Sequence, residues 1–323
     1  MPDFAAADRS NPLRPRHQSS DMDARGVHDT DTKEGDSSIL HARLDCVRPL
    51  PSLNLDLFGV RWQIHCDDDR AVALIARNFS EFVSAAHREG PSHRINIRSA
   101  PSGWILESKL PPIEAEDTYD LLYHLEKVLT IDAQVQRSDL FFLHSAVLGY
   151  RNTAFLLVAS SGSGKSTTAW ALANRGFGYL SDELAPIDLT SFTVEPYPHA
   201  LCLKSRPPAP FEIPRDAIVT SRTLHIPTTS IPDVVRQPMP LRAVFFNRFD
   251  HAAATPRVSP LGRGETSALL YSHALNPLAH DQAGLRGVAT IATRTQGYAL
   301  TTGDLEQTCD LVRATLDGLL RSG

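Results

Sequence analysis

Hydrophobic and polar positions divide the chain into regions of different pattern. From residue 139 to 323, short apolar runs alternate with turn residues and predict a mixed α/β domain. A turn at Arg151-Asn152 joins the first two expected strands, at 142–149 and 153–159. Further strands are expected at 178–180, 184–187, 192–194, 201–204 and 241–247, with a Pro-rich loop at 206–240. Helical spacing predicts helices at 167–175 (ended by Gly176), 264–272 and 304–321.

A smaller α+β module is expected over residues 41–138. Alternating apolar positions predict strands at 53–57, 60–66, 95–97 and 104–107. Helical spacing predicts one helix that Asp68 or Asp69 caps and that runs to about His87, and a second at about 115–135. The acidic triplet 67–69 could hold a metal, but a solvated turn that caps the helix explains it better.

Residues 1–40 show no hydrophobic periodicity and are rich in Asp, Arg, Ser, Pro and Gly. A segment of this composition cannot bury enough apolar surface to offset the entropy of ordering it, so it predicts a disordered leader. The expected organisation is therefore 1–40, 41–138 and 139–323.

Composition narrows the classes of partner. The chain has 323 residues, 42% of them hydrophobic and 21% charged, which is enough to bury a full core. The net charge of −5 argues against nucleic acid or an anionic membrane as partner, and no apolar run approaches the ~20 residues of a membrane span. The four cysteines lie far apart and form no C-x-x-C pair. Free thiols in a reducing compartment are favoured, which predicts a cytoplasmic protein.

The strongest chemical signal lies between the expected strand at 153–159 and the helix that follows it. There the chain reads Ser160-Ser161-Gly162-Ser163-Gly164-Lys165-Ser166-Thr167. In such a loop the backbone N–H groups turn toward one anion, Lys165 reaches the outer phosphates and Ser166 is placed to ligate Mg²⁺. Ala159 replaces the first glycine of the motif, at a position where a small residue suffices. The loop predicts a site for ATP or GTP.

Further candidate residues accompany this loop. Asp182 and Glu183 follow an expected strand, where one carboxylate could bind Mg²⁺ and the other could orient or deprotonate an acceptor hydroxyl. His144 precedes the loop strand, so a hairpin could return it to the phosphates, although a histidine there is ordinarily a core residue. Lys204 could approach a phosphate or the acceptor, or could be a solvated surface lysine.

These segments resemble the HPr serine kinase/phosphorylase family. The resemblance rests on residues 143–148, on the loop at 161–166, and on 175–183, where an Arg-Gly turn leads to an acidic pair. Within that family the chain is most similar to HPr-kinase-related proteins of peptide-modification gene clusters, such as lasso-peptide precursor kinases. Those proteins also favour Ser-Asp-Glu and a later Pro-rich stretch that ends in lysine, as at 196–204. The clear likeness covers residues 141–204.

The resemblance implies a phosphoenolpyruvate-carboxykinase-like P-loop kinase core that uses ATP and Mg²⁺ to phosphorylate a serine of a peptide or protein. It implies catalytic roles for Asp182, Glu183, His144 and Lys165, phosphate binding by residues 160–167, and metal binding by Ser166 and Asp182. The chain departs from the family at Glu183, which replaces a second aspartate, and lacks an Arg-Gly-x-Gly stretch after the acidic pair. These departures argue against HPr as the acceptor and against a reverse dephosphorylation.

The residues themselves leave the acceptor open, because a phosphate loop carries no information about it. A small-molecule kinase would have the same loop. A nucleotide-binding regulatory protein with little catalysis would need the loop but not the acidic pair. Assembly into a homo-oligomer also stays open.

Overall fold

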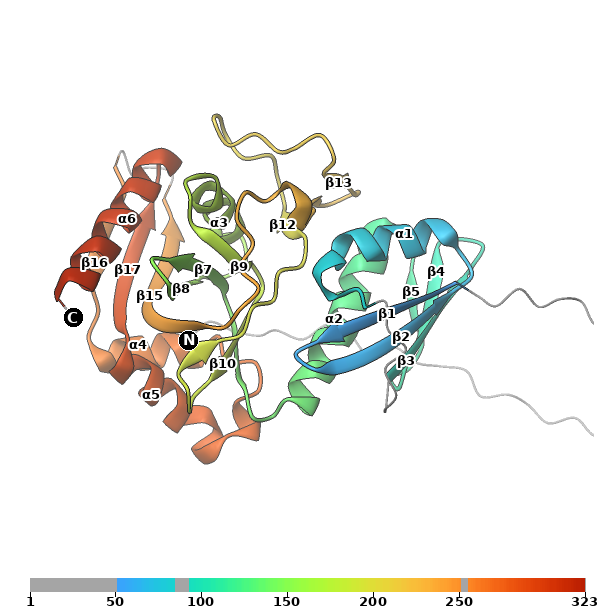
Figure 1. Cartoon of the computed structure of the whole chain (residues 1–323), viewed down its shortest axis with the longest axis horizontal. Helices are drawn as coiled ribbons and strands as arrows, with labels where there is room; N and C mark the ends of the chain where they lie inside the picture. The colour runs from blue at the N-terminus through green and yellow to red at the C-terminus, as the bar shows by residue number, and fades with distance from the viewer. Residues whose placement is uncertain (1–50, 85–92, 251–254, 323) are drawn as a thin grey trace, which may run out of the picture. The chain divides into compact units, whose positions relative to one another are not determined.

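The computed structural model describes residues 51–84, 93–250 and 255–322 (Figure 1). The expected leader at 1–40 and residues 41–50 of the expected α+β module lie outside these ranges. The described chain is a mixed α/β structure with several sheets, as the hydrophobic pattern predicts. None of the described helices is long and apolar enough to cross a membrane.

The first part of the described chain is built on a five-stranded sheet. Its strands are β1 (Ser52–Leu57), β2 (Val60–Cys66), β3 (His93–Ser99), β4 (Trp104–Glu107) and β5 (Ile113–Ala115), which lie in sequence order. The β2–β3 pair is parallel and the other pairs are antiparallel. Helices α1 (Asp69–Asn78) and α2 (Thr118–Gln136) share one hydrophobic core with this sheet.

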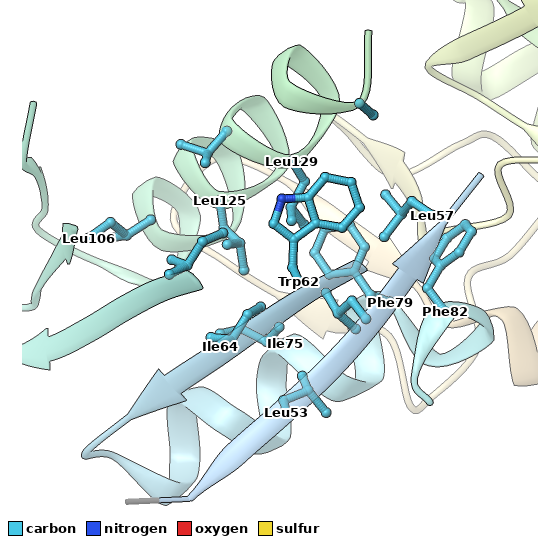
Figure 2. Close-up of a cluster of buried hydrophobic side chains, with 14 of the residues drawn as sticks. Leu53, Leu57, Trp62, Ile64, Ile75, Phe79, Phe82, Leu106, Leu125 and Leu129 are labelled. Atoms are coloured by element: carbon cyan, nitrogen blue, oxygen red, sulfur yellow. The ribbon is translucent and has the colours of Figure 1, made fainter. Parts of the chain in front are cut away.

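Trp62 of β2 lies in the middle of this core (Figure 2). Its side chain is 1% exposed, and its indole Nε1 donates a hydrogen bond of 3.1 Å to Asp132 Oδ2 on α2. Every second residue of β1 and β2 is buried, which is the physical origin of the alternation in the sequence. Figure 2 shows Leu57 and Ile64 of the sheet packed with Leu125 of α2 around the indole.

Helix α1 is shorter than the pattern predicts. It ends at Asn78 rather than near His87, where Phe79 leaves helical geometry and donates its N–H to the carbonyl of Ile75. A 3₁₀ turn, η1 (Ser80–Phe82), then carries Phe82 into the core. Phe82, which continues the apolar pattern of the helix in the sequence, therefore reaches the core from a 3₁₀ turn and not from the helix.

Capping sets where both helices of this part begin. The Asp68 side chain accepts a hydrogen bond of 2.8 Å from the N–H of Arg70, as the capping interpretation predicts. The Asp117 side chain accepts one of 2.9 Å from the N–H of Asp120, so α2 begins at Thr118. The helix thus starts a few residues later than expected: residues 116 and 117 are not helical, and Ala115 ends the edge strand β5.

Nine strands form the large sheet of the second part. They are β6 (Phe141–His144), β7 (Ala146–Tyr150), β8 (Thr153–Val158), β9 (Gly178–Ser181), β10 (Leu184–Asp188), β11 (Thr193–Val194), β15 (Met239–Phe249), β16 (Arg257–Pro260) and β17 (Gln296–Thr302). Seven of them follow the order β6-β10-β11-β15-β8-β7-β9, and β17 pairs with β15 and β16. Strands β8, β15 and β17 run parallel, and the other pairs are antiparallel.

Helices cover both faces of the large sheet (Figure 1). Helices α3 (Lys165–Asn174) and α6 (Leu305–Ser322) share a core with Phe155 and Leu157 of β8. Helices α4 (Arg263–Tyr271) and α5 (Leu285–Arg294) share a second core with Leu156 and Val158. Because β8 is buried on both faces, it reads in the sequence as a continuous apolar run.

The strand expected at 142–149 is two strands. Strand β6 pairs with β10, whereas β7 pairs with β8 and β9. Ser145 separates them, and its buried hydroxyl donates to the carbonyl of Leu157 at 3.1 Å. A polar residue inside the core therefore marks the point where the chain changes its neighbours in the sheet.

Segment 206–240, expected to be a loop, contributes two strands to a small third sheet. Its order is β12 (Leu201–Leu203), β14 (Leu224–Ile226), β13 (Ile218–Val219). Strand β12 agrees with the strand expected at 201–204, whereas β13 and β14 are two and three residues long within a Pro-rich segment and show no period there. The hydrophobic pattern also gives no indication of α5, β16 and β17.

Leu125→Ala should lower the free energy of unfolding by about 2–5 kcal/mol, because it leaves a cavity at a fully buried position of α2. Val135→Ala, on the same helix but 68% exposed, is the matched control and should change it by less than ~0.5 kcal/mol. Urea denaturation of both variants measures the difference. Equal destabilisation would mean that α2 does not pack as described.

Candidate active site

The predicted phosphate loop, residues 160–166, connects the end of β8 to the start of α3. Gly162 and Gly164 have φ angles of 85° and 76°, in the left-handed region that L side chains rarely adopt, which is why glycine is required at both. The carbonyl of Ser163 accepts a hydrogen bond of 3.1 Å from Asn247 Nδ2, at the end of the neighbouring strand β15. The loop leads directly into the N-terminus of α3, where the helix dipole and free backbone N–H groups favour binding of an anion.

Lys165 is the first residue of α3, and its side chain is only 8% exposed. Its Nζ donates a hydrogen bond of 2.6 Å to the backbone carbonyl of Asp182 and lies 3.6 Å from Glu183 Oε2. The lysine ammonium therefore connects the phosphate loop to the acidic pair directly, as their order in the sequence suggests.

Glu183 also contacts His144. Strands β6 and β10 are neighbours, with His144 opposite Leu184, and this pairing brings His144 Nδ1 to 3.1 Å from Glu183 Oε1. Burial favours the neutral acid, but the hydrogen bond from His144 and the charge of Lys165 outweigh it and hold the pKa of Glu183 below its usual range. The carboxylate is therefore ionised at neutral pH, with 43% of its side chain exposed.

Asp182, although adjacent in sequence, is 1% exposed and has a different environment. Its Oδ1 accepts a hydrogen bond of 2.8 Å from the hydroxyl of Tyr179, and its Oδ2 accepts one of 3.0 Å from the backbone N–H of Cys202. Burial raises the pKa of Asp182, against the opposing charges of His199 and Lys165. Both oxygens are thus used inside the protein.

The side chain of His199 is 2% exposed and lies between the carboxylates of Asp182 and Glu126. Its Nε2 is 2.8 Å from Glu126 Oε1 on α2 and 3.7 Å from Asp182 Oδ1, while its Nδ1 is 2.6 Å from the carbonyl of Ala200. Two carboxylates and a backbone carbonyl thus surround the ring, an environment that favours the protonated imidazolium. Burial lowers the pKa of His199, but the charge and hydrogen bond of Glu126 and the charge of Asp182 raise it to about 10.

A cavity of about 780 Å³ lies over the phosphate loop. Glu183, His144 and Lys165 line it, whereas Asp182 does not. The cavity continues past the loop to α2, where Tyr119 and Tyr123 also line it. The rings of these two tyrosines are stacked, with centroids 5.8 Å apart and an angle of 7° between their planes.

The structure brings most of the predicted residues together. Residues 160–162 and 164–167, His144 and Glu183 line one cavity, and Lys204 joins them by donating from Nζ to Ser161 Oγ at 2.7 Å. Ser163 of the loop and Asp182 do not line the cavity: the Ser163 carbonyl accepts from Asn247, and the Asp182 carboxylate accepts from Tyr179 and Cys202. Asp182 is the predicted catalytic residue that the cavity does not reach. Its predicted contact with metal is not supported by this geometry, and its predicted catalytic role stays a prediction.

Three residues of the site, Glu126, His199 and Asn247, belong to no recognisable sequence motif and were not predicted. Glu126 and His199 are placed by tertiary contacts between α2 and the loop before β12, which local pattern does not encode. Asn247 could have been noticed, because it is the first polar residue after the apolar run of β15, a strand that pairs with β8.

Ser166 lines the cavity beside the phosphate loop and offers the hydroxyl oxygen that Mg²⁺ accepts as a ligand. Together with nucleotide phosphates and water, one protein oxygen fits how Mg²⁺ is commonly bound. Among the described residues no group of three or more His, Cys, Asp or Glu side chains could hold a metal. The triplet 67–69 supports the turn interpretation, since Asp67 accepts from Ser99 and Asp68 from Arg70 and Trp104.

Comparison with known proteins gives little independent information. No family model matches the chain, and no significant match occurs among the curated proteins. A solved structure described as the HPr(Ser) kinase/phosphatase from Coxiella burnetii is 10% identical, with a TM-score of 0.24, over 56% of this chain and 94% of that chain. At that identity and TM-score the match carries no weight, so the chemistry has to follow from the chain's own residues.

Asp182→Asn and Glu183→Gln should differ in their effect on stability. The amide introduced at position 182 would place an N–H₂ against one of two hydrogen-bond donors, so the free energy of unfolding should fall by about 1–3 kcal/mol. Glu183→Gln keeps an oxygen that can accept from Lys165 and changes a side chain that is 43% exposed, so its cost should be smaller. Denaturant unfolding of both variants is the measurement. A larger loss for Glu183→Gln would show that the two side chains have the opposite orientation.

The pKa of His199 also predicts a dependence of stability on pH. A pKa that rises from 6.5 in the unfolded chain to about 10 in the folded one stabilises the fold fully below about pH 6.5, and that contribution is lost as the pH rises toward 10. His199→Gln should therefore show a smaller fall in melting temperature between these values than the wild type. Glu126→Gln, which lowers the folded pKa, should move the fall to lower pH. Parallel curves for all three proteins would contradict the buried imidazolium.

Proposed function

We propose that this chain is an ATP-dependent kinase that transfers the γ-phosphoryl group to the hydroxyl of a serine in a peptide or protein. The observation that carries the proposal is the contact of the Glu183 carboxylate with both Lys165 and His144 beside the phosphate loop. A loop that only holds a nucleotide requires the lysine. It does not require an ionised carboxylate held open to the cavity beside it.

Lys165 supplies positive charge to the phosphoryl group as it moves. Phosphoryl transfer passes through a loose transition state in which charge spreads over the phosphoryl oxygens, so positioning and electrostatics provide most of the catalysis. In the described structure Lys165 is held by the carbonyl of Asp182 and by Glu183. When ATP is present, the ammonium is close enough to the loop to exchange one of these contacts for a phosphate oxygen.

Glu183 positions the acceptor. Its low pKa makes it a weak base, so its main role is to accept a hydrogen bond from the serine hydroxyl and hold that oxygen in line with the γ-phosphorus. As the new P–O bond forms, the bond from the γ-phosphorus to the bridging oxygen breaks and releases ADP, and the hydroxyl proton passes to Glu183. His144 donates a hydrogen bond to the same carboxylate and fixes its orientation.

Magnesium, when bound, neutralises charge on the phosphates, and Ser166 is the residue of the loop that would hold it. Asp182 has a supporting role in this proposal. Its backbone carbonyl accepts a hydrogen bond from Lys165, and its side chain accepts hydrogen bonds from Tyr179 and from the backbone N–H of Cys202. These contacts fix the backbone position from which the Glu183 side chain extends into the cavity. This arrangement gives the two adjacent carboxylates separate duties, one structural and one facing the substrate.

The acceptor class rests on the resemblance and on the extent of the cavity. The cavity extends from the phosphate loop to Tyr119 and Tyr123 of α2, and Tyr123 is 48% exposed. This leaves space, lined by aromatic side chains, for residues that flank an acceptor serine. A small-molecule acceptor would have no need of contacts at that distance from Glu183.

The function is tested with ATP, Mg²⁺ and serine-containing peptides, read by mass spectrometry for an added phosphate. Lys165→Ala should weaken ATP binding sharply in calorimetry, because the phosphates lose the charge at the loop. Glu183→Gln should bind ATP but lower turnover by about 10²–10⁴. Lys127→Ala, an exposed lysine on α2, is the matched control and should behave as wild type.

Each failure has a different meaning. ATP affinity unchanged in Lys165→Ala would remove the phosphate-loop assignment. ATP binding without transfer to peptides, but with transfer to small hydroxyl compounds, would replace the acceptor class. Wild-type turnover in Glu183→Gln would leave a nucleotide-binding protein whose acidic pair is structural.

A further inference from the structure

A second cavity, of about 370 Å³, lies at the opposite end of the large sheet from the phosphate loop. The phosphate loop follows the C-terminal end of β8, whereas this cavity lies at the N-terminal ends of β15 and β17, which run parallel to β8. Arg242 near the start of β15 and Asn247 near the loop are separated by five residues of strand, or roughly 16 Å. The two cavities share no lining residue.

The second cavity carries a concentrated positive charge. Three of its lining residues are Arg242, Arg263 and Arg294, and none of its described lining residues is acidic. These arginines form no ion pair within the described chain. All three side chains are exposed, so water screens their mutual repulsion, but three guanidinium groups with no acidic partner around one concavity give it a positive potential that favours an anion.

One of the three is held in place. The guanidinium of Arg294, at the end of α5, lies 3.9 Å from the centroid of the Phe192 ring, which is itself 5% exposed. Stacking on a buried ring fixes the plane of the guanidinium but uses none of its N–H donors. Arg294 is therefore positioned with its donors available to a ligand.

Two further features favour an anion at this position. Helix α4 begins beside the cavity at Arg263, and its N-cap, Gly262, offers no side chain to the first N–H groups of the helix. These groups, with the positive end of the helix dipole, attract an anion. Thr266, one turn further, is among the residues that line the cavity, and its buried hydroxyl, packed against Gly297, has no hydrogen-bond partner within the described chain. A buried hydroxyl without a partner is costly unless a ligand or water satisfies it.

We propose that this cavity binds a phosphate monoester of a small organic molecule, at a site separate from the proposed kinase site. The arginines, the α4 N-terminus and Thr266 would bind the phosphate. The remaining lining includes Leu261, Leu319 and Leu320, which would contact the organic group. The volume exceeds what a phosphate alone requires, and its apolar side explains why the ligand is an ester and not the free ion.

The test is calorimetric titration of the full chain with phenyl phosphate, with inorganic phosphate and citrate as comparison ligands. Arg294→Gln and Arg263→Gln should each weaken phenyl phosphate binding by roughly tenfold or more, the scale of losing a charge-assisted hydrogen bond. The matched control is Arg286→Gln, which lies on the same helix α5, 73% exposed and paired with Asp281 outside the cavity. It should bind as wild type. Thr266→Val removes only the hydroxyl and should weaken binding by a smaller factor.

Lys165→Ala separates this site from the phosphate loop, and Lys165→Met, which keeps the aliphatic stem, replaces it if the alanine variant fails to fold. Binding retained in this variant but lost in Arg294→Gln supports the second site, whether or not the chain is a kinase. Binding lost in the Lys165 variant and retained in the arginine variants overturns the second site and leaves the phosphate loop as the binder. Citrate binding as tightly as phenyl phosphate would overturn the choice of a phosphate ester.

Discussion

The arrangement of the site depends on one buried cation. Lys165 is 8% exposed at the start of α3, and an ammonium in such a position is tolerated only when acceptors surround it. The carbonyl of Asp182 and the carboxylate of Glu183 provide them. This requirement fixes the end of β9 against the phosphate loop, and the pairing of β6 with β10 then delivers His144 to the same carboxylate. The geometry of the candidate site follows from satisfying that charge.

The sequence predicted the parts of the structure that local chemistry determines. The strand–loop–helix of the phosphate loop, the Asp68 cap and the alternating strands β1 and β2 are confirmed, because each depends on residues close together in the chain. The end of α1, the break at Ser145 and the small sheet of 206–240 were not predicted. Those features depend on which distant segments pack together, and short strands leave no period to read.

The same distinction applies to the site. Lys165, His144 and Glu183 could be named from motifs, and the structure places them in contact. The sequence could not separate the environments of Asp182 and Glu183, because adjacent residues on a strand end point in different directions and only the tertiary fold decides which is buried. Nor could it indicate that Glu126, far upstream, supplies the counter-charge for His199.

The contact between Glu126 and His199 bears on how the chain can be divided. Glu126 belongs to α2, the helix that packs on the five-stranded sheet, whereas His199 lies against Asp182 in the part built on the nine-stranded sheet. The charge balance of the candidate site is thus shared across the boundary that hydrophobic pattern places near residue 138. The two parts are consequently not interchangeable modules: a related chain that exchanged its first part would have to bring a carboxylate to the same place or lose the histidine as well.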